Sequence, residues 1–403
     1  MQTFAIIGAG EAGVAAAGAL RSHGFKGRLV LIDADRRHPY ARPPLSKAVL
    51  TENAGPEGIR STGWFEDHAI DLMLGVRVNE INAASRQLII EGHSTATLAY
   101  DKLLIATGAR IRRLSFLGTA SESAAYLRTF DDALTLKQRL AEADTIAVVG
   151  GGVIGLEVAS SACKLGKRVI VLEAAERLMN RAVSADVSAE LLQLHFAKGV
   201  DVRFGVRLVG AEFDGDRARL ALDTGEWINS DFIVAGIGVD PDVELARAMG
   251  CKISNGIEVD GNGLTSIDDV FAAGDVALFP HPVFEQQVRI ESWQHARKHG
   301  AHVGAAMLGH ITPYEEIPWF WTDQHGVNVQ VAGLPNAADS HIVRGKTRLH
   351  FAGERLVGVT TFDNGRDIRP ASKLIAARWQ ADLARVTGSE PLSSFLLARP
   401  LPQ

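Results

Sequence analysis

Two glycine motifs of one form lie in this 403-residue chain and constrain its fold more than any other feature. Residues 8–13 read GAGEAG, and residues 150–155, which begin 142 positions later (150 − 8), read GGGVIG. In a GxGxxG loop the first glycine makes a tight turn, the second lets the backbone approach a pyrophosphate, and the third lets the following helix pack closely on the sheet. Two such loops predict two dinucleotide sites, an arrangement typical of hydride transfer from a nicotinamide to a flavin.

The residues around each motif predict a strand, a helix and a second strand. Apolar runs at residues 4–7 and 29–33 flank the first motif, and runs at 146–149 and 169–173 flank the second. Asp33 lies 25 positions after Gly8 and Glu173 lies 23 positions after Gly150, where a carboxylate accepts hydrogen bonds from ribose hydroxyls. The alternative is two glycine-rich turns in an ordinary α/β fold, which the repeated context disfavours.

Composition is typical of a globular protein that binds neither nucleic acid nor membrane. Apolar residues make up 46% of the chain and charged residues 22%, and the net charge of −5 argues against broad nucleic-acid binding. No apolar stretch approaches 18 residues, and the first residues show no basic segment followed by an apolar one. We therefore expect no membrane span, no secretion signal and a cytoplasmic location.

The two cysteines argue against thiol chemistry. Cys163 and Cys251 lie 88 positions apart (251 − 163), whereas the redox-active cysteine pairs of many flavin- and nicotinamide-dependent reductases lie a few residues apart. We interpret both as structural residues. No spacing typical of metal ligands occurs, so we expect no metal.

The order of the motifs predicts an α/β protein with two Rossmann-like dinucleotide-binding domains and a small C-terminal α+β domain. We place a discontinuous FAD-binding domain at residues 1–110 and 236–314, an inserted NAD-binding domain at 111–235, and the C-terminal domain at 315–403. Two adjacent prolines are expected to hold residues 39–47 extended. A linker is expected around residues 114–123 and a loosely held tail at 391–403.

Six blocks occur in a fixed order: GAGEAG at 8–13, RPPLSK at 42–47, ATG at 106–108, GGGVIG at 150–155 with Glu157, Gly274-Asp275, and PWFWTDQ at 318–324. This series resembles the FAD-dependent ferredoxin reductases of bacterial oxygenase systems. That family includes the reductases of aromatic-ring-hydroxylating dioxygenases, putidaredoxin reductase and rubredoxin reductase, which are two-dinucleotide flavoproteins of the glutathione-reductase type. The glycine motifs are generic, whereas RPPLSK and WFWTDQ are much more specific, and the match covers nearly the whole chain.

The resemblance implies a set of cofactor-binding residues. It places Lys47 near the isoalloxazine ring and Glu157 facing the nicotinamide pocket, so these two are the candidate catalytic residues. A cation such as Lys47 or Arg42 near the ring stabilises the negative charge that reduced flavin carries. For FAD the implied residues are Gly8, Gly10, Glu11, Ala12, Gly13, Asp33, Arg42, Lys47, Ala106, Thr107, Gly108, Arg128, Gly274, Asp275, Glu291, Ser292, Trp293 and Trp321; for NAD they are Gly150, Gly152, Val153, Ile154, Gly155, Glu157, Glu173 and Gly238.

Some of these residues also have purely structural interpretations. The alternatives are a solvated surface lysine for Lys47, a carboxylate stabilised near a helix N-terminus for Glu157, and an interdomain surface arginine for Arg128. Trp293 is alternatively a core residue. Glu173 favours NADH because a carboxylate repels a 2′-phosphate, although Arg177 leaves room for weaker use of NADPH.

The resemblance implies that the aromatic block at residues 319–321 lies beside the flavin, on the side where the iron–sulfur protein docks. An exposed aromatic ring near a basic rim would suit an acidic [2Fe-2S] ferredoxin. We expect the rings of Trp319 and Trp321 to lie on opposite faces of an extended segment, one toward the flavin and the other toward the partner. A core cluster in the third domain is the alternative. Candidate cations at the rim of this face are Arg289, Arg297, Lys298 and Arg369.

The function that best fits these residues is a ferredoxin reductase, with hydride transfer from NADH to FAD and then single-electron transfer to a [2Fe-2S] ferredoxin that feeds an oxygenase. A rubredoxin reductase, an NADH oxidase and a redox-sensing flavoprotein are the alternatives. The sequence leaves monomer and homodimer open, and it identifies neither the ferredoxin nor the final substrate.

Overall fold

The computed structural model describes residues 1–92, 95–214, 217–388 and 390–396. Contacts divide the chain into two units, each assembled from three segments. The first unit comprises residues 1–41, 56–110 and 240–318, and the second comprises residues 42–55, 111–239 and 319–403. The chain passes between the units after residues 41, 55, 110, 239 and 318, and two of these crossings lie in β8 (Ala109–Ile111) and β16 (Val239–Pro241).

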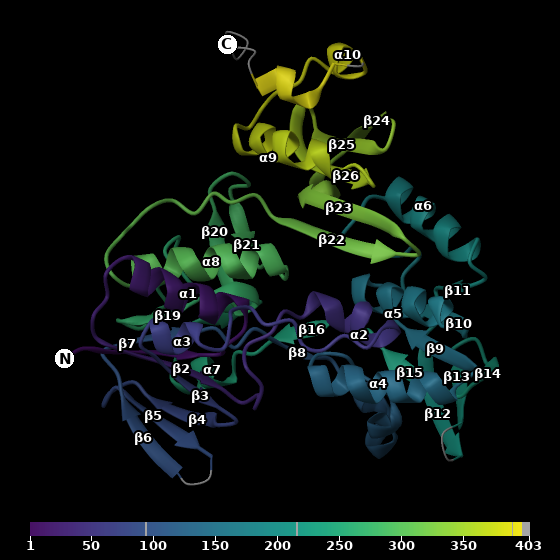
Figure 1. The fold of residues 1–403 in the computed structure, drawn as a ribbon. Helices are drawn as coiled ribbons and strands as arrows, with labels where there is room; N and C mark the ends of the chain where they lie inside the picture. The colour runs from purple at the N-terminus through teal and green to yellow at the C-terminus, as the bar shows by residue number, and fades with distance from the viewer. Residues whose placement is uncertain (93–94, 215–216, 389, 397–403) are drawn as a thin grey trace. The chain divides into compact units, whose positions relative to one another are not determined.

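The first unit is built on a five-stranded parallel sheet with the order β19-β7-β1-β2-β3 (Figure 1). Phe4 and Ile6 of β1 pack with α1 and α8, whereas Ala5 and Ile7 pack with two smaller sheets on the opposite face. Because both faces are covered, the strands are continuous apolar runs. The elements are β1 (Thr3–Ile7), α1 (Glu11–Ser22), β2 (Arg28–Asp33), β3 (Ile70–Leu74), β7 (Lys102–Ile105), β19 (Val270–Ala272) and α8 (Trp293–Ala306).

Two smaller sheets complete the first unit. One has the order β4-β5-β6 and is antiparallel; the other has the order β17-β18-β20-β21. The elements are α3 (Trp64–Asp67), β4 (Arg77–Asn82), β5 (Gln87–Glu91), β6 (Thr95–Ala99), α7 (Glu244–Ala248), β17 (Ile253–Ser254), β18 (Gly256–Glu258), η3 (Gly274–Val276), β20 (Ala277–His281) and β21 (Gln286–Val288).

The second unit repeats the parallel arrangement with the strand order β11-β10-β9-β15 (Figure 1). A three-stranded antiparallel sheet, β12-β13-β14, shares an apolar core with β9 through Ala147 and Val149. The elements are η1 (Pro43–Ser46), α2 (Ala48–Thr51), η2 (Ser115–Ser123), α4 (Phe130–Glu142), β9 (Thr145–Val149), α5 (Val153–Lys164), β10 (Arg168–Glu173), α6 (Ala185–Phe196), β11 (Asp201–Phe204), β12 (Leu208–Asp214), β13 (Arg217–Leu222), β14 (Trp227–Ser230) and β15 (Phe232–Ala235).

The C-terminal part of the second unit is a five-stranded antiparallel sheet with the order β22-β23-β26-β25-β24. Its first hairpin turns at His325 and Gly326, which have φ values of +52° and +82°. Two successive positive φ values are typical of the tight turn that matches the twist of a hairpin. The elements are β22 (Trp319–Gln324), β23 (Val327–Gly333), η4 (Pro335–Ala337), β24 (Ser340–Arg344), β25 (Thr347–Ala352), β26 (Arg355–Phe362), η5 (Gly365–Asp367), α9 (Ile368–Ala376), α10 (Leu383–Val386) and η6 (Leu392–Leu396).

The predicted fold class is confirmed, but the prediction that residues 39–47 are extended throughout was wrong. Residues 43–46 form a 3₁₀ helix instead of staying extended, because a proline φ near −65° also fits the first positions of a helix, where no N–H is needed. The predicted linker carries η2. In the tail, Leu392 and Phe395 are buried; residues 397–403 lie outside the described part. The predicted domain boundaries stay a prediction.

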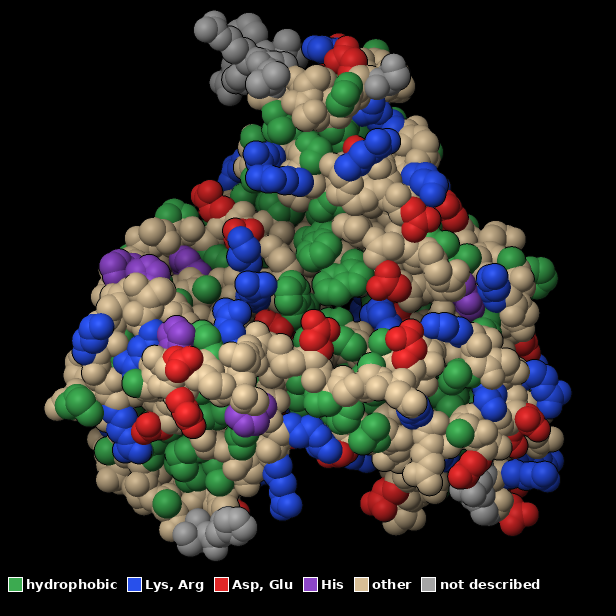
Figure 2. Space-filling view, viewed as in Figure 1, with side chains coloured by type: hydrophobic (Ala, Val, Ile, Leu, Met, Phe, Trp, Pro, Cys, Tyr) green, Lys and Arg blue, Asp and Glu red, His purple; other side chains and the backbone are tan. Residues whose placement is uncertain are grey.

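Among the described residues, no helix is both long enough and apolar enough to cross a bilayer. On the face shown in Figure 2, Lys and Arg side chains are interspersed with those of Asp and Glu. This mixture agrees with the small net charge of −5.

A cluster of neutral histidines lies in the core of the first unit. His295 and His299, one turn apart on α8, are buried beside Phe279 and Tyr314, and the Tyr314 hydroxyl lies 3.0 Å from His295 Nδ1. Burial lowers the pKa of His295 to about 3, and it lowers the pKa of His299 well below its usual range. Both rings therefore stay neutral in the folded protein at pH 5, where histidines of an unfolded chain are protonated.

The first unit should lose stability as the pH falls below about 6.5, the ordinary histidine pKa. In that range the unfolded chain binds protons that His295 and His299 in the folded chain do not bind. Each ring then lowers the free energy of unfolding by up to about 1.4 kcal/mol per pH unit. Urea unfolding between pH 7.5 and 5.0 measures this slope. His299→Leu should flatten it, whereas the control His310→Leu, at an exposed position, should not; equal slopes in all three proteins would contradict the expectation.

Candidate functional site

The first glycine loop connects β1 to α1 and has the geometry of a dinucleotide cradle. Gly8 has a φ of +105°, and a Cβ there would lie 2.3 Å from the carbonyl oxygen of Ala106. A Cβ on Gly13 would lie 1.9 Å from the Gly8 oxygen, so both positions require glycine for packing within the protein. A Cβ on Gly10 would meet nothing within 4 Å. That open space at the start of a helix fits the approach of a pyrophosphate.

The second loop, between β9 and α5, repeats this geometry. Gly150 has a φ of +108°, with a virtual Cβ 2.4 Å from the oxygen of Gly236, and a Cβ on Gly155 would lie 2.1 Å from the Gly150 oxygen. At Gly152 the nearest atom would be 4.0 Å away. Ile154, in the first turn of α5, is half exposed beside this open space. The residues present therefore fit a second dinucleotide.

The two carboxylates predicted to bind ribose, Asp33 and Glu173, also stabilise the glycine loops that precede them in the chain. Asp33 Oδ2 accepts the N–H of Ala9 at 2.5 Å, and Glu173 Oε2 accepts the N–H of Gly151 at 2.6 Å. Each carboxylate has lone pairs left for ribose hydroxyls. Arg177, considered as a partner for a 2′-phosphate, instead donates to two backbone carbonyl oxygens, those of Val183 and Asn180.

Glu11 and Trp293 meet at the start of α1. The indole N–H of Trp293 donates to Glu11 Oε1 at 2.5 Å. Burial raises the pKa of Glu11 above its ordinary value, and the hydrogen bond from Trp293 opposes this rise. Arg60 and Arg297 line a hollow of ≈ 110 Å³ together with this pair. Two cations at the positive end of a helix suit an anionic ligand.

The remaining flavin residues assigned in the first unit adjoin the same loop. A Cβ on Gly274, whose φ is +79°, would lie 2.9 Å from Cβ of Ala12, so the two segments are in close contact. The Thr107 hydroxyl donates to the carbonyl oxygen of Asp242 at 2.7 Å. Ser292 caps α8. Gly108 has a φ of +70°, Asp275 is half-buried, and Glu291 is paired with Arg289.

In the second unit a buried carboxylate collects donors from three segments. Glu157, on α5, has 2% of its surface exposed. Its Oε2 accepts from Lys47 Nζ at 2.7 Å and from the Ser46 hydroxyl, and its Oε1 accepts from the Thr322 hydroxyl at 2.7 Å. Lys47 Nζ also donates to the carbonyl oxygen of Pro43 at 3.1 Å. The two candidate catalytic residues are therefore a single ion pair.

Three residues of these clusters carry no motif signal of their own. Ser46 and Thr322 lie inside the blocks RPPLSK and WFWTDQ, but nothing in those letters shows that they share Glu157, which lies 111 and 165 positions away along the chain. Arg60 belongs to no block at all. Only the folded chain brings these side chains to their partners.

The expectation for the tryptophan pair was wrong. The rings of Trp319 and Trp321 stack with centroids 5.3 Å apart and an interplanar angle of 21°. Positions i and i+2 of a strand lie on the same face, so the two rings form one aromatic surface and do not point to opposite sides. Trp319 Nε1 is anchored by Gln330 Oε1 at 3.2 Å.

The assigned residues divide between the two units. The nicotinamide set lies wholly in the second unit, and there a Cβ on Gly238 (φ +103°) would lie 3.2 Å from Arg181 Nη2. The flavin set is split, since Arg42, Lys47, Arg128 and Trp321 belong to the second unit and the others to the first. Arg42 is exposed at the start of η1.

Three of the four candidate rim cations have partners within the protein. Arg289 pairs with Glu291 at 2.5 Å, Lys298 pairs with Glu316 at 3.0 Å, and Arg297 lies over the ring of Trp293. Arg369 is exposed on α9.

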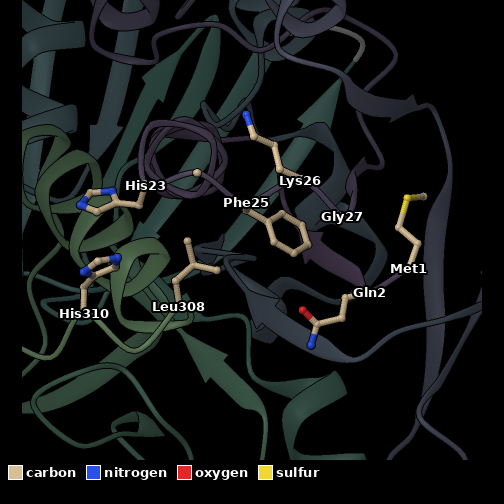
Figure 3. Close-up of a pocket in the computed structure, with 9 residues that line it drawn as sticks. Met1, Gln2, His23, Phe25, Lys26, Gly27, Leu308 and His310 are labelled. Atoms are coloured by element: carbon tan, nitrogen blue, oxygen red, sulfur yellow. The ribbon is translucent and has the colours of Figure 1, made fainter.

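A larger open hollow of ≈ 480 Å³ lies elsewhere in the first unit (Figure 3). His23 and His310 face each other at its edge, beside Phe25 and Leu308. It lies near the C-terminal end of α1, whereas the glycine loop is at the N-terminal end, roughly 18 Å away for a helix of this length. It is therefore separate from the dinucleotide cradle.

The described residues hold neither a thiol pair nor a metal site. Cys163 and Cys251 are both free, and burial raises the pKa of each thiol. No group of three or more His, Cys, Asp or Glu side chains in the described ranges is arranged to hold a metal ion.

Comparison with known proteins agrees with this geometry. Residues 2–300 match the family described as pyridine nucleotide-disulphide oxidoreductase, and residues 319–395 match the reductase C-terminal family. The chain belongs to the pyridine nucleotide-disulphide oxidoreductase family. It is therefore an oxidoreductase, and its two cradles fit the FAD and the NADH that this family and its reductase members imply.

Individual relatives match over almost the entire chain. The 3-phenylpropionate/cinnamic acid dioxygenase ferredoxin–NAD(+) reductase component of Photorhabdus laumondii is 38% identical over 381 residues, which cover 93% of this chain and 96% of the relative. A rubredoxin–NAD(+) reductase of Ectopseudomonas oleovorans is 35% identical, with 89% and 95% covered. The crystal structure of a covalent putidaredoxin reductase–putidaredoxin complex matches with a TM-score of 0.93 and 32% identity, covering 98% of each chain.

Removing the cation from the buried pair should destabilise the second unit. Lys47→Met leaves Glu157 buried with two hydroxyl donors but no counter-charge, which should cost about 2 kcal/mol of unfolding free energy. The matched control is Lys164→Met, because Lys164 pairs with Glu52 at 3.5 Å on the surface and its loss should cost less than about 0.5 kcal/mol. Urea unfolding followed by hydrogen exchange on α5 measures both; equal losses would show that the Lys47–Glu157 pair behaves like a surface pair.

Proposed function

We propose that this protein is the NADH-dependent ferredoxin reductase of an oxygenase system, which takes a hydride from NADH and passes electrons one at a time to a [2Fe-2S] ferredoxin. The observation that carries the proposal is the pair of dinucleotide cradles built to the same geometry in one chain. The reductase component of Photorhabdus laumondii, which is 38% identical, supports the choice of acceptor. FAD, when bound, supplies the conversion between two-electron and one-electron chemistry.

The protein's own side chains are proposed to bind, orient and compensate charge. The backbone N–H groups at the starts of α1 and α5 bind the two pyrophosphates. Asp33 and Glu173 accept from ribose hydroxyls. Lys47 supplies a positive charge near the reacting atoms, and Glu157 fixes the position of that charge through the 2.7 Å ion pair. No side-chain acid or base is needed for hydride transfer.

The thiol-dependent oxidase alternative lacks a suitable nucleophile. Cys251 is buried, Cys163 is half-buried on α5, and the raised pKa of each thiol disfavours the thiolate. Two unpaired cysteines also suit a reducing compartment, so the cytoplasm is the proposed location. The boundaries at 110/111 and 235/236 and the C-terminal domain from 315 remain part of the proposal.

A [2Fe-2S] ferredoxin should raise turnover strongly. We expect FAD-loaded protein to reduce cytochrome c with NADH at least about tenfold faster when ferredoxin is added, because a one-electron carrier then links the two. Rubredoxin in place of ferredoxin is the matched control for the choice of carrier. Equal consumption of NADH by oxygen alone, with no response to ferredoxin, would replace the proposal by the oxidase or sensor alternatives; a response to rubredoxin only would replace the acceptor.

Glu173 should determine the preference for NADH. Glu173→Gln removes the negative charge that repels a 2′-phosphate, so the ratio of kcat/KM for NADH to that for NADPH should fall about tenfold. The neighbouring exposed residue provides the control variant, Glu176→Gln, which should leave the ratio unchanged. If the ratio in Glu173→Gln stays at the wild-type value, the role assigned to this carboxylate is wrong.

A further inference from the structure

A row of polar side chains continues from Glu157 through the second unit. Thr322 and Gln324 lie on the same face of β22, and the Gln324 Nε2 atom lies 3.0 Å from Thr322 Oγ1. Gln324 Oε1 lies 2.8 Å from His195 Nε2, at the end of α6. His195 Nδ1 in turn lies 3.0 Å from Nε2 of His325, in the hairpin turn. Thr322, Gln324 and His195 are fully buried, and His325 is partly exposed.

The chemistry of these groups fixes the direction of every hydrogen bond. An ionised carboxylate only accepts, so the Thr322 hydroxyl must donate to Glu157. Its oxygen is then free to accept from the amide of Gln324, whose Nε2 also lies 3.7 Å from the sulfur of Met179. The Gln324 carbonyl oxygen must therefore accept from His195 Nε2–H.

The two histidines continue the series of hydrogen bonds in the same direction. Burial lowers the pKa of His195, and burial together with the nearby His195 and Lys198 lowers the pKa of His325 to about 4. Each neutral ring carries one N–H. Because the His195 proton is on Nε2, its Nδ1 must accept from His325 Nε2–H. The hairpin is held in register by the backbone N–H of His325, which donates to the Ser160 hydroxyl at 2.7 Å on α5.

We propose that His325, His195, Gln324 and Thr322 form a one-directional chain of hydrogen bonds that positions Glu157, and through it Lys47, for the reaction with NADH. The chain rests on the proposed function for its catalytic meaning. Four neutral groups donate in sequence toward one carboxylate oxygen, while Lys47 and Ser46 occupy the other. The carboxylate is thereby held in one rotamer from two sides, and among the described residues Lys47 is its one charged hydrogen-bond partner.

Thr322 is the point at which the chain can be cut with least disturbance. Thr322→Val keeps the shape of the side chain but removes the donor, whereas Thr322→Ser keeps the hydroxyl. The matched control is Thr360→Val, because Thr360 is another fully buried threonine of the same sheet whose hydroxyl contacts a histidine, His350, at 3.1 Å. Thr360 has no contact with the Glu157 cluster among its described hydrogen bonds.

The rate of FAD reduction by NADH, followed anaerobically by stopped flow, separates positioning from binding. We expect Thr322→Val to slow reduction about tenfold with less than about a threefold change in the Kd for NADH, because a displaced charge affects the reaction more than the ground state. Thr322→Ser and Thr360→Val should stay within about twofold of wild type. An unchanged rate in Thr322→Val, or an equal loss in Thr322→Ser, would overturn the proposal.

The tautomers of the histidines test the direction of the chain without any turnover. In ¹⁵N-histidine-labelled holoenzyme at pH 7, with His195→Phe and His325→Phe used for assignment, both rings should carry the proton on Nε2. A proton on Nδ1 of His195 would overturn the proposal. Neither measurement involves a ferredoxin, so a failure of the ferredoxin assay and a failure of the chain are distinguishable.

Discussion

The buried charge of Glu157 imposes a constraint on the whole second unit. A carboxylate with 2% exposure is costly unless it is paired and fully hydrogen-bonded. Its donors come from η1, from the residue after η1 and from β22, segments widely separated along the chain. η1 with the following Lys47 and the C-terminal sheet must therefore both be in place against α5 before the charge is compensated. A local rearrangement of either segment would leave an uncompensated carboxylate in the core.

The two glycine loops share one backbone geometry, and the glycines in each loop are of two kinds. In each loop, two glycines are required because the protein packs against them, whereas the middle glycine faces open space. The first kind of glycine is explained by the fold alone; the second is explained by a ligand. This contrast, present in both units, separates a dinucleotide cradle from an ordinary glycine-rich turn.

Sequence patterns predicted what is local and repeated. The structure has strands before and after each glycine motif, with a helix between them, where the apolar runs and the glycines indicated. Asp33 and Glu173 lie at the ends of β2 and β10, also as predicted. Pro43 and Pro44 led to the wrong prediction of an extended segment, because the φ angle of proline fits both an extended chain and a 3₁₀ helix. The prediction that Trp319 and Trp321 lie on opposite faces was wrong, because residues two positions apart in a strand share a face. Ser46 and Thr322 were beyond prediction, because their shared partner Glu157 is set by tertiary contacts alone.

The neutrality of the hydrogen-bond chain has a physical purpose beside a lysine. Lys47 already supplies one full positive charge to Glu157 at 2.7 Å. A second cation on the other oxygen would add attraction, but it would also bring a further desolvation cost. Neutral donors avoid that cost, since they orient the carboxylate without adding net charge. The burial that lowers the pKa of His195 and His325 thus keeps the chain uncharged, so that Lys47 supplies the charge and the hydrogen-bonded row supplies the geometry.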